Sequence, residues 1–154
     1  MKTLSDPDRG RVKLQPVDAT IEGLVSLERP ALLPGTGRAD SVEMTVYRVD
    51  ARLLGLFTEA DGDYHLVLAS PRDATITMIA EVPDPACAGA CVSGFAEVYA
   101  RVRQKLMDRL NAPGGEARPL VRITGVGFFD YLHGQRGVAP NGIELHPVLD
   151  VEFP

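Results

Sequence analysis

The order in which strand and helix patterns follow one another constrains the fold of this chain more than any other feature. Five segments have the alternating or β-branched character of strands, and a long amphipathic helix pattern lies between the third and the fourth. Strand-strand-strand-helix-strand-strand is the order of the OB-fold, a five-stranded, partly open barrel. The sequence therefore predicts a mainly β, OB-fold-like barrel with one helix. The alternative is a plain α+β sheet covered by that helix.

The first strand pattern changes its apolar face midway, and this favours the barrel over the open sheet. Val46 has the opposite parity to Val49 and Leu53, which lie further along the same strand. A strand whose apolar face changes side is bent or bulged, and Gly55 offers a second bending point. Because such a strand can pair with both halves of a sheet, we expect it to close the barrel.

The later strands and the helix are bounded by turn and cap signals. Strand patterns cover residues 64–69, 75–81, 120–129 and 143–153, and Asp61-Gly62 is a hairpin signal before the first of these. Ser93 is the expected N-cap of the helix. The apolar stripe of the helix consists of Phe95, Val98, Tyr99, Val102, Leu106 and Leu110. The polar residues expected to point outward from the last strand are Glu144, His146, Asp150 and Glu152.

Residues 1–40 are expected to form an N-terminal extension that packs on a barrel domain of residues 41–154. The extension is rich in proline and glycine, and Asp18 is the expected N-cap of a short helical stretch whose apolar residues are Ile21, Leu24 and Val25. A partner-binding arm is the functional alternative to a simple cover over the core. The chain has 154 residues, of which 45% are hydrophobic and 24% charged, so a globular domain of ordinary composition is expected.

Charge and hydropathy disfavour two classes of partner. The chain has 16 Lys and Arg against 21 Asp and Glu, and the formal net charge of −5 is a poor basis for binding nucleic acid. Single-stranded nucleic-acid binding, a common use of this barrel, is therefore only the second alternative function. The sequence has no apolar run long enough to span a membrane.

Imidazole side chains offer the clearest candidates for metal binding or acid–base chemistry. The chain has three of them: His65, His133 and His146. Asp61, Asp63 or Glu144 would complete a metal site, although no spacing such as H-E-x-x-H occurs. The simplest interpretation is that the three are ordinary hydrogen-bonded histidines, and no cofactor is expected. A metal-assisted hydrolase or nuclease that uses these His and Asp/Glu residues is the first alternative function.

A nuclease would also place arginines that bind phosphate beside acids that hold a cation. Arg48, Asp50 and Arg52 share one face of the first strand. Alternating charges on a solvated strand face explain this triplet equally well. Gly125-Val126-Gly127 lacks the third glycine and the following helix of a dinucleotide-binding loop.

The long loop of residues 130–142 is the segment most suited to bind a ligand. It joins the last two strands, where barrels of this type often contact ligands. Its candidate ligand-binding residues are Tyr131, His133, Gln135, Arg136 and Asn141. They suit a polar ligand, a glycan or a protein segment, and a structural hairpin is the alternative. The leading functional hypothesis is a non-catalytic binding or interaction module.

The cysteines and the first residues leave the compartment open. Cys87 and Cys91 are spaced C-x3-C, which fits two free thiols, a small-loop disulfide or half of a composite metal site. Residues 1–6 have no apolar stretch of the kind that signal peptides carry. We therefore expect either a mature exported chain or a cytoplasmic protein.

Several long motifs resemble an uncharacterised family of small bacterial proteins. The matching segments are residues 63–68, 77–85, 125–130, 133–135 and 137–150. The resemblance covers most of the chain from Asp6-Pro7 onward, and it implies an OB-fold-like barrel but no established activity. Many members of that family are exported, which implies a periplasmic or extracellular location. This chain departs from them in lacking a leader and in carrying Cys91 beside Cys87.

Overall fold

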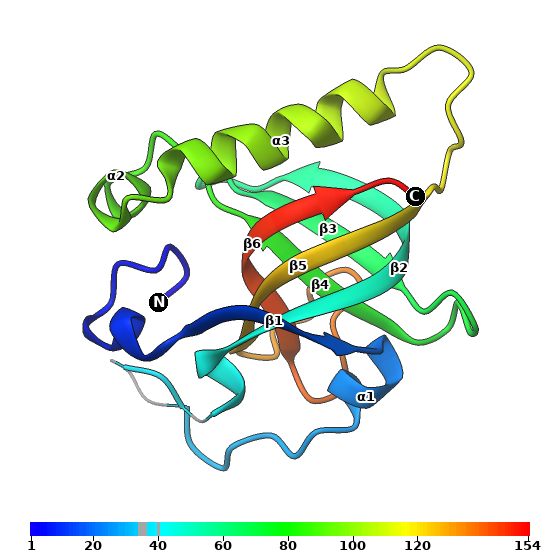
Figure 1. The fold of residues 1–154 in the computed structure, drawn as a ribbon. Helices are drawn as coiled ribbons and strands as arrows, with labels where there is room; N and C mark the ends of the chain where they lie inside the picture. The colour runs from blue at the N-terminus through cyan, green and yellow to red at the C-terminus, as the bar shows by residue number, and fades with distance from the viewer. Residues whose placement is uncertain (34–36, 40) are drawn as a thin grey trace.

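Five strands close into a mixed β-barrel, which confirms the OB-fold-like architecture expected from the sequence (Figure 1). The protein is represented by a computed structural model in which residues 1–33, 37–39 and 41–154 are described. The strands of the barrel, in their order around it, are β2 (Thr45–Thr58), β3 (Tyr64–Ala69), β4 (Thr77–Val82), β6 (Ile143–Glu152) and β5 (Leu120–Phe129). Pairing of β5 with β2 closes the ring, and β4 and β6 are the only parallel neighbours within it.

The bend in β2 is confirmed and is what allows the barrel to close. Residues 46–52 of β2 pair with β5, whereas residues 52–58 pair with β3. The register with β3 shifts between Leu53 and Gly55, at the expected bending point. Val49 and Leu53 face the main core, whereas Val46 packs in a smaller cluster on the outer side, so the change of apolar face is also confirmed.

Helix α3 (Ala96–Leu110) lies across one end of the barrel (Figure 1). Its residues Tyr99, Val102 and Leu106 are fully buried against the inward-facing strand residues. The prediction that Ser93 is its N-cap was wrong. Ser93 is the last residue of α2 (Ala88–Ser93), and a left-handed Gly94 separates the two helices, so the N-cap position falls on residue 95.

The N-terminal part of the extension adds a sixth strand, which the sequence did not reveal. β1 (Lys13–Ala19) pairs in parallel with β2, next to the short helix α1 (Ile21–Val25) on the side opposite α3 (Figure 1). Nearly all β1 side chains are exposed and Pro16 interrupts the pairing, so the strand has no apolar alternation to reveal it. Two short 3-10 turns, η1 (Pro7–Arg11) and η2 (Val42–Met44), complete this region. Residues 34–36 and 40 of the expected extension lie outside the described residues.

The N-cap of helix α1 lies two residues later than expected. Thr20, and not Asp18, is its N-cap, because the Thr20 hydroxyl accepts a hydrogen bond from Gly23 N at 3.0 Å. Asp18 instead accepts a hydrogen bond from the Arg48 guanidinium of β2 at 2.7 Å.

The two cysteines lie at the start of α2, and both are free thiols. Cys87 is the N-cap of the helix, where its sulfur accepts a hydrogen bond from Ala90 N. Cys91 is exposed one turn later. None of the helices in the described part of the chain is both long and apolar enough to cross a membrane.

Candidate functional site

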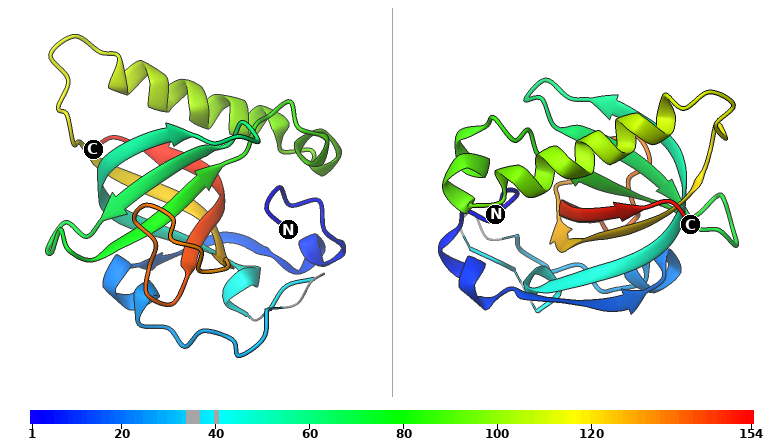
Figure 2. Two further views of the ribbon diagram at one scale, coloured as in Figure 1. Left: turned by 180° about the vertical axis from the view of Figure 1, so that it is seen from behind. Right: turned by 45° about the horizontal axis from the view of Figure 1, so that its top comes forward.

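A pocket of about 690 Å³ opens between the β2–β3 turn and the long β5–β6 loop. Phe57 and residues 59–61 form one wall, and residues 133–136 form the other. His65 of β3 and Glu81 of β4 form the floor, where the two residues are direct cross-strand partners. The loop, orange in Figure 2, lies beside β3 and β4 when the barrel is viewed from behind. The pocket thus lies on the face and loops that barrels of this type use for ligands.

The base of the long loop is tied to the N-terminal extension. The Arg29 guanidinium donates hydrogen bonds to the carbonyls of Asp130 and Asn141, both at 2.8 Å. The Asn141 amide in turn donates to the carbonyls of Leu24 and Leu27 at 3.0 Å, at the end of α1. The side-chain amide of Asn141, a candidate ligand-binding residue in the sequence, therefore holds the loop in place.

Three of the other candidate ligand-binding residues line the pocket. The Gln135 amide lies 2.7 Å from Nε2 of His133, and the Arg136 guanidinium lies 4.7 Å from the centre of the Phe57 ring. Tyr131 is 62% exposed and faces a separate hollow beside Phe129. Among the residues that the structure describes, the middle of the loop therefore lines the pocket, whereas the Tyr131 side chain at its start does not.

His65 is held by two acceptors at the floor of the pocket. Its Nε2 donates to the carbonyl of Arg136 at 2.9 Å, and its Nδ1 lies 3.1 Å from Oε1 of Glu81. The hydrogen bond to Glu81 raises the pKa of His65 above its ordinary value, and this outweighs the opposing effect of burial. His65 thus joins the long loop to the barrel through both of its ring nitrogens.

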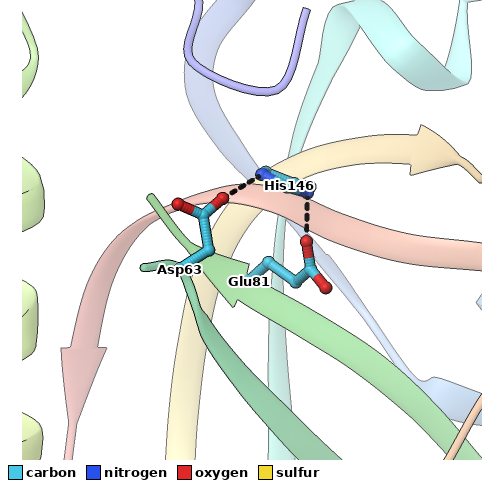
Figure 3. Close-up of side chains that lie close together, drawn as sticks. All are labelled: Asp63, Glu81 and His146. Atoms are coloured by element: carbon cyan, nitrogen blue, oxygen red, sulfur yellow. Dashed lines mark ion pairs between the residues drawn. The ribbon is translucent and has the colours of Figure 1, made fainter. Parts of the chain in front are cut away.

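His146 of β6 lies behind this floor and has no exposed surface. Its Nδ1 lies 2.9 Å from Oε2 of Glu81 and 3.1 Å from Oε1 of Glu144. On the other side of the ring, Nε2 lies 3.7 Å from Oδ2 of Asp63, as Figure 3 shows. Within the described residues this Nε2 atom has no hydrogen-bond partner.

Burial and hydrogen bonding set the protonation of these groups in opposite directions. Burial alone would lower the pKa of His146, but the carboxylates of Glu144 and Glu81 outweigh it and raise the pKa to about 9. Burial opposes ionisation of Glu81, yet the two histidines hold its pKa well below the usual range. Burial raises the pKa of Glu144 and of Asp63. Glu81 is therefore the ionised centre of the network.

Glu144 and His146 point outward from the barrel, as expected, but the outer face that carries them is buried. Both lie on the outer side of β6, as the alternation predicts, but they are only 2% and 0% exposed. Phe128 packs edge-on against the His146 ring at 5.9 Å, and the Lys2 ammonium lies 5.6 Å from the centre of the Phe128 ring. The outer face of β6 is buried here because residues from distant parts of the chain cover it.

Lys2 is the positively charged part of this cover. Its ammonium lies 3.2 Å from Asp130 and 3.9 Å from Glu81. Burial lowers the pKa of Lys2, but Glu144, Asp130 and Glu81 outweigh that effect and raise it. A buried, two-bond ion pair between Asp6 and Arg38 holds the first residues of the chain over the barrel.

The structure separates the three histidines that the sequence suggests as metal ligands. His65 and His133 lie in the pocket, whereas His146 lies behind it and shares Glu81 with His65. In the described part of the chain, the group able to hold an ion consists of Asp63, Glu81 and His146, whose ligand atoms lie within 4.8 Å of one another. Glu81 was not a candidate in the sequence. Its position opposite His65 in the β3–β4 hairpin register is the signal that could have identified it.

No protein-family model matches the chain, and no curated protein matches it. The chemistry of the site is therefore inferred from its geometry. The pocket offers hydrogen-bonding groups of both kinds beside an aromatic ring, and the groups behind it form a charged and largely buried network.

Proposed function

We propose that the protein is a non-catalytic binding module that holds an uncharged polar ligand, a glycan in particular, in the pocket between the β2–β3 turn and the β5–β6 loop. The pocket is the observation that carries the proposal. Its volume of about 690 Å³ is typical of small-molecule sites. OB-fold barrels bind oligosaccharides and oligonucleotides on this face and with these two loops.

The chemistry of the walls suits a sugar. Phe57 and the Arg136 guanidinium that lies over it present a flat surface at the pocket edge. The Gln135 amide nitrogen is already bonded to Tyr131 O and His133 Nε2, so Gln135 supplies its oxygen as an acceptor. The carboxylates of Glu59 and Asp61 supply acceptors on the opposite wall. A sugar ring offers an apolar face to the first surface and hydroxyl donors to the second.

The charge of the pocket disfavours a polyanion. Its carboxylates are Glu59, Asp61, Glu81 and Asp130, and its fixed cations are Lys2 and Arg136. Both cations already have partners, because Lys2 pairs with Asp130 and Arg136 lies over Phe57. Single-stranded nucleic acid, whose affinity depends on neutralised phosphates, gains little here.

A nuclear magnetic resonance titration tests the proposal. The uniformly ¹⁵N-labelled protein is titrated with neutral cello-, malto- and chito-oligosaccharides and, separately, with a short single-stranded DNA. We expect one oligosaccharide class to shift the amides of residues 57–61 and 133–136 in a saturable way. Phe57→Ala should weaken this binding at least about fivefold, since stacking on an aromatic side chain contributes about 1–3 kcal/mol.

Tyr131→Ala is the matched control, because Tyr131 is an exposed aromatic residue of the same loop that lies outside the pocket. It should leave the affinity unchanged. Shifts confined to other surfaces, an absence of shifts with every oligosaccharide, or salt-dependent binding of the DNA alone would each overturn the proposal.

A further inference from the structure

The outer nitrogen of His146 is a buried polar atom for which the described residues provide no hydrogen-bond partner. The side chain has no exposed surface, and Nε2 has no hydrogen bond within the described part of the chain. Buried polar atoms are nearly always paired, and one left unpaired costs about 1–3 kcal/mol. An atom of this kind, aimed at a carboxylate, points to a ligand that fills the gap.

The separation between Nε2 of His146 and Oδ2 of Asp63 fits a shared ion better than a hydrogen bond. The two atoms are 3.7 Å apart. Hydrogen bonds of this type have lengths of about 2.7–3.2 Å. Two ligand atoms of a tetrahedral zinc ion, each about 2.0–2.2 Å from the metal, lie about 3.4 Å apart. A shift of a few tenths of an ångström would therefore place both atoms in bonding range of one ion.

Two carboxylates lie within hydrogen-bonding distance of Nδ1, the inner nitrogen of His146, although one acceptor would satisfy it. Nδ1 carries at most one proton, yet Glu81 and Glu144 lie within 2.9 and 3.1 Å of it. Glu144 alone can accept that proton and orient the ring, as carboxylates commonly do behind metal-binding histidines. Glu81, whose Oε2 lies on the Nδ1 side of the ring, can then turn its carboxylate toward the Nε2 side. Its ligand atom lies within 4.8 Å of those of the other two residues.

We propose that Asp63, Glu81 and His146 bind a divalent transition-metal ion of the Zn²⁺ class. The ion replaces the proton on Nε2 of His146, which is released to solvent. One imidazole with two carboxylates favours such an ion over Mg²⁺ or Ca²⁺, which prefer oxygen ligands alone. The side chains of Asp63 and Glu81 are 12% and 13% exposed, so the ion reaches the site past them.

Zinc binding by the chelator-treated, full-length protein tests this site. Calorimetry with Zn²⁺ and trace-metal determination after dialysis should show one equivalent bound at His146, and Mg²⁺ should not compete for it. Asp63→Asn is the central variant, because the asparagine oxygen can still accept the hydrogen bond that Asp63 accepts from Asp84 N at 2.8 Å. It should weaken Zn²⁺ binding at least tenfold while leaving the folded spectrum intact.

Two controls separate this site from adventitious binding. His133→Ala removes an exposed imidazole, and Cys91→Ser removes an exposed thiol, so neither should change the affinity. Zn²⁺ should also shift the side-chain nitrogen resonances of His146 and not those of His133. The proposal is overturned by absence of a bound equivalent, by undiminished affinity in Asp63→Asn, or by loss of the equivalent in either control.

Discussion

A pair of charged sets on the outer side of the barrel strands can be compared, because the two sets differ mainly in what covers them. The first, termed the exposed ladder, pairs Arg48 with Asp18 and Arg122 with Asp50 across β1, β2 and β5, both at 2.7 Å. These side chains are 40–75% exposed. The second, termed the buried cluster, consists of His65, Glu81, Glu144 and His146 on β3, β4 and β6 and of Asp63 directly before β3.

The comparison shows that burial, more than contact distance, separates a solvated strand face from a candidate site. Contacts in the two sets have similar lengths, but water screens the ladder, whose pairs therefore add little to stability. The buried cluster lies where charges interact strongly and where an unpaired group is costly. Groups whose pKa values are shifted by burial and by specific partners, beside a pocket, mark functional sites more often than exposed pairs do.

The largest effect should follow from removing the central imidazole of the buried cluster. His146→Ala leaves Glu81 and Glu144 without their shared buried partner, and we expect a loss of about 3–5 kcal/mol in the free energy of unfolding. Urea denaturation followed by circular dichroism measures it. The exposed His133→Ala should stay close to the parent protein. Equal losses of unfolding free energy in His146→Ala and His133→Ala would contradict the expected difference between buried and exposed histidines.

The pH dependence of stability should come from the same residue. Because the folded state raises the pKa of His146 from 6.5 to about 9, its bound proton stabilises the metal-free protein fully below about pH 6.5. That contribution, on the order of 3 kcal/mol, is lost as the pH rises to about 9. His65, whose pKa is also raised, acts in the same direction.

Urea midpoints measured from pH 6 to pH 9, at a constant slope with denaturant, check this expectation. His146→Gln should flatten the decline. A midpoint that stays level or rises across this range in the parent protein would contradict a charged, buried His146.

The long loop also covers part of the buried cluster, through the bond between the Arg136 carbonyl and His65. A single added methyl group should loosen its contact with β3. Gly137 and Gly134 both have left-handed backbone angles, with φ of 77° and 83°. A Cβ at position 137 would lie 2.5 Å from Cγ1 of Val67, whereas one at position 134 meets nothing within 4 Å. Gly134→Ala should therefore cost about 1 kcal/mol of backbone strain, and Gly137→Ala about 2–3 kcal/mol because the loop must also move.

Hydrogen exchange distinguishes the two variants. Gly137→Ala alone should speed exchange at residues 133–138, because it lifts the Arg136 carbonyl from His65. If both variants change exchange equally, contact with β3 does not hold the loop.

The smallest effect is expected in the exposed ladder. Replacing Asp50 and Arg122 by Asn and Gln, singly and together, removes an ion pair that solvent already screens. The unfolding midpoint should not change measurably, and added salt should not alter that result. A coupling free energy between Asp50 and Arg122 as large as the one expected for the buried pair of His146 and Glu81 would contradict the distinction between the two regions.

The barrel could be predicted from the sequence because its signals are local. The parity change between Val46 and Val49 and the stripe through Tyr99 and Leu106 depend on residues close together in the chain. β1 was not predicted, because its side chains are exposed and its pairing depends on β2, which lies much later in the chain. Strand pairing without an apolar face leaves no periodic signal.

The site was predicted in part, for a related reason. The sequence suggested the long loop as a ligand-binding segment, which stays a prediction, and its residues 133–136 line the pocket. Alternation also placed Glu144 and His146 on the outer face of β6. Their burial depends on Lys2, which is far away in the sequence, and on Phe128, which lies on β5. No local sequence pattern can therefore predict that burial. The central role of Glu81 depends in the same way on pairing with two histidines from different strands.

The ionisation of His146 is the most direct measure of whether this outer strand face is a covered, charged cluster. Long-range ¹H–¹⁵N spectra of the imidazole rings, recorded on the metal-free protein across the pH range, give the pKa of each histidine. We expect His146 to remain doubly protonated at neutral pH and to titrate with a pKa of about 9. Titration of His146 at or below its ordinary value of 6.5 would show that the face is solvated or its carboxylates misplaced.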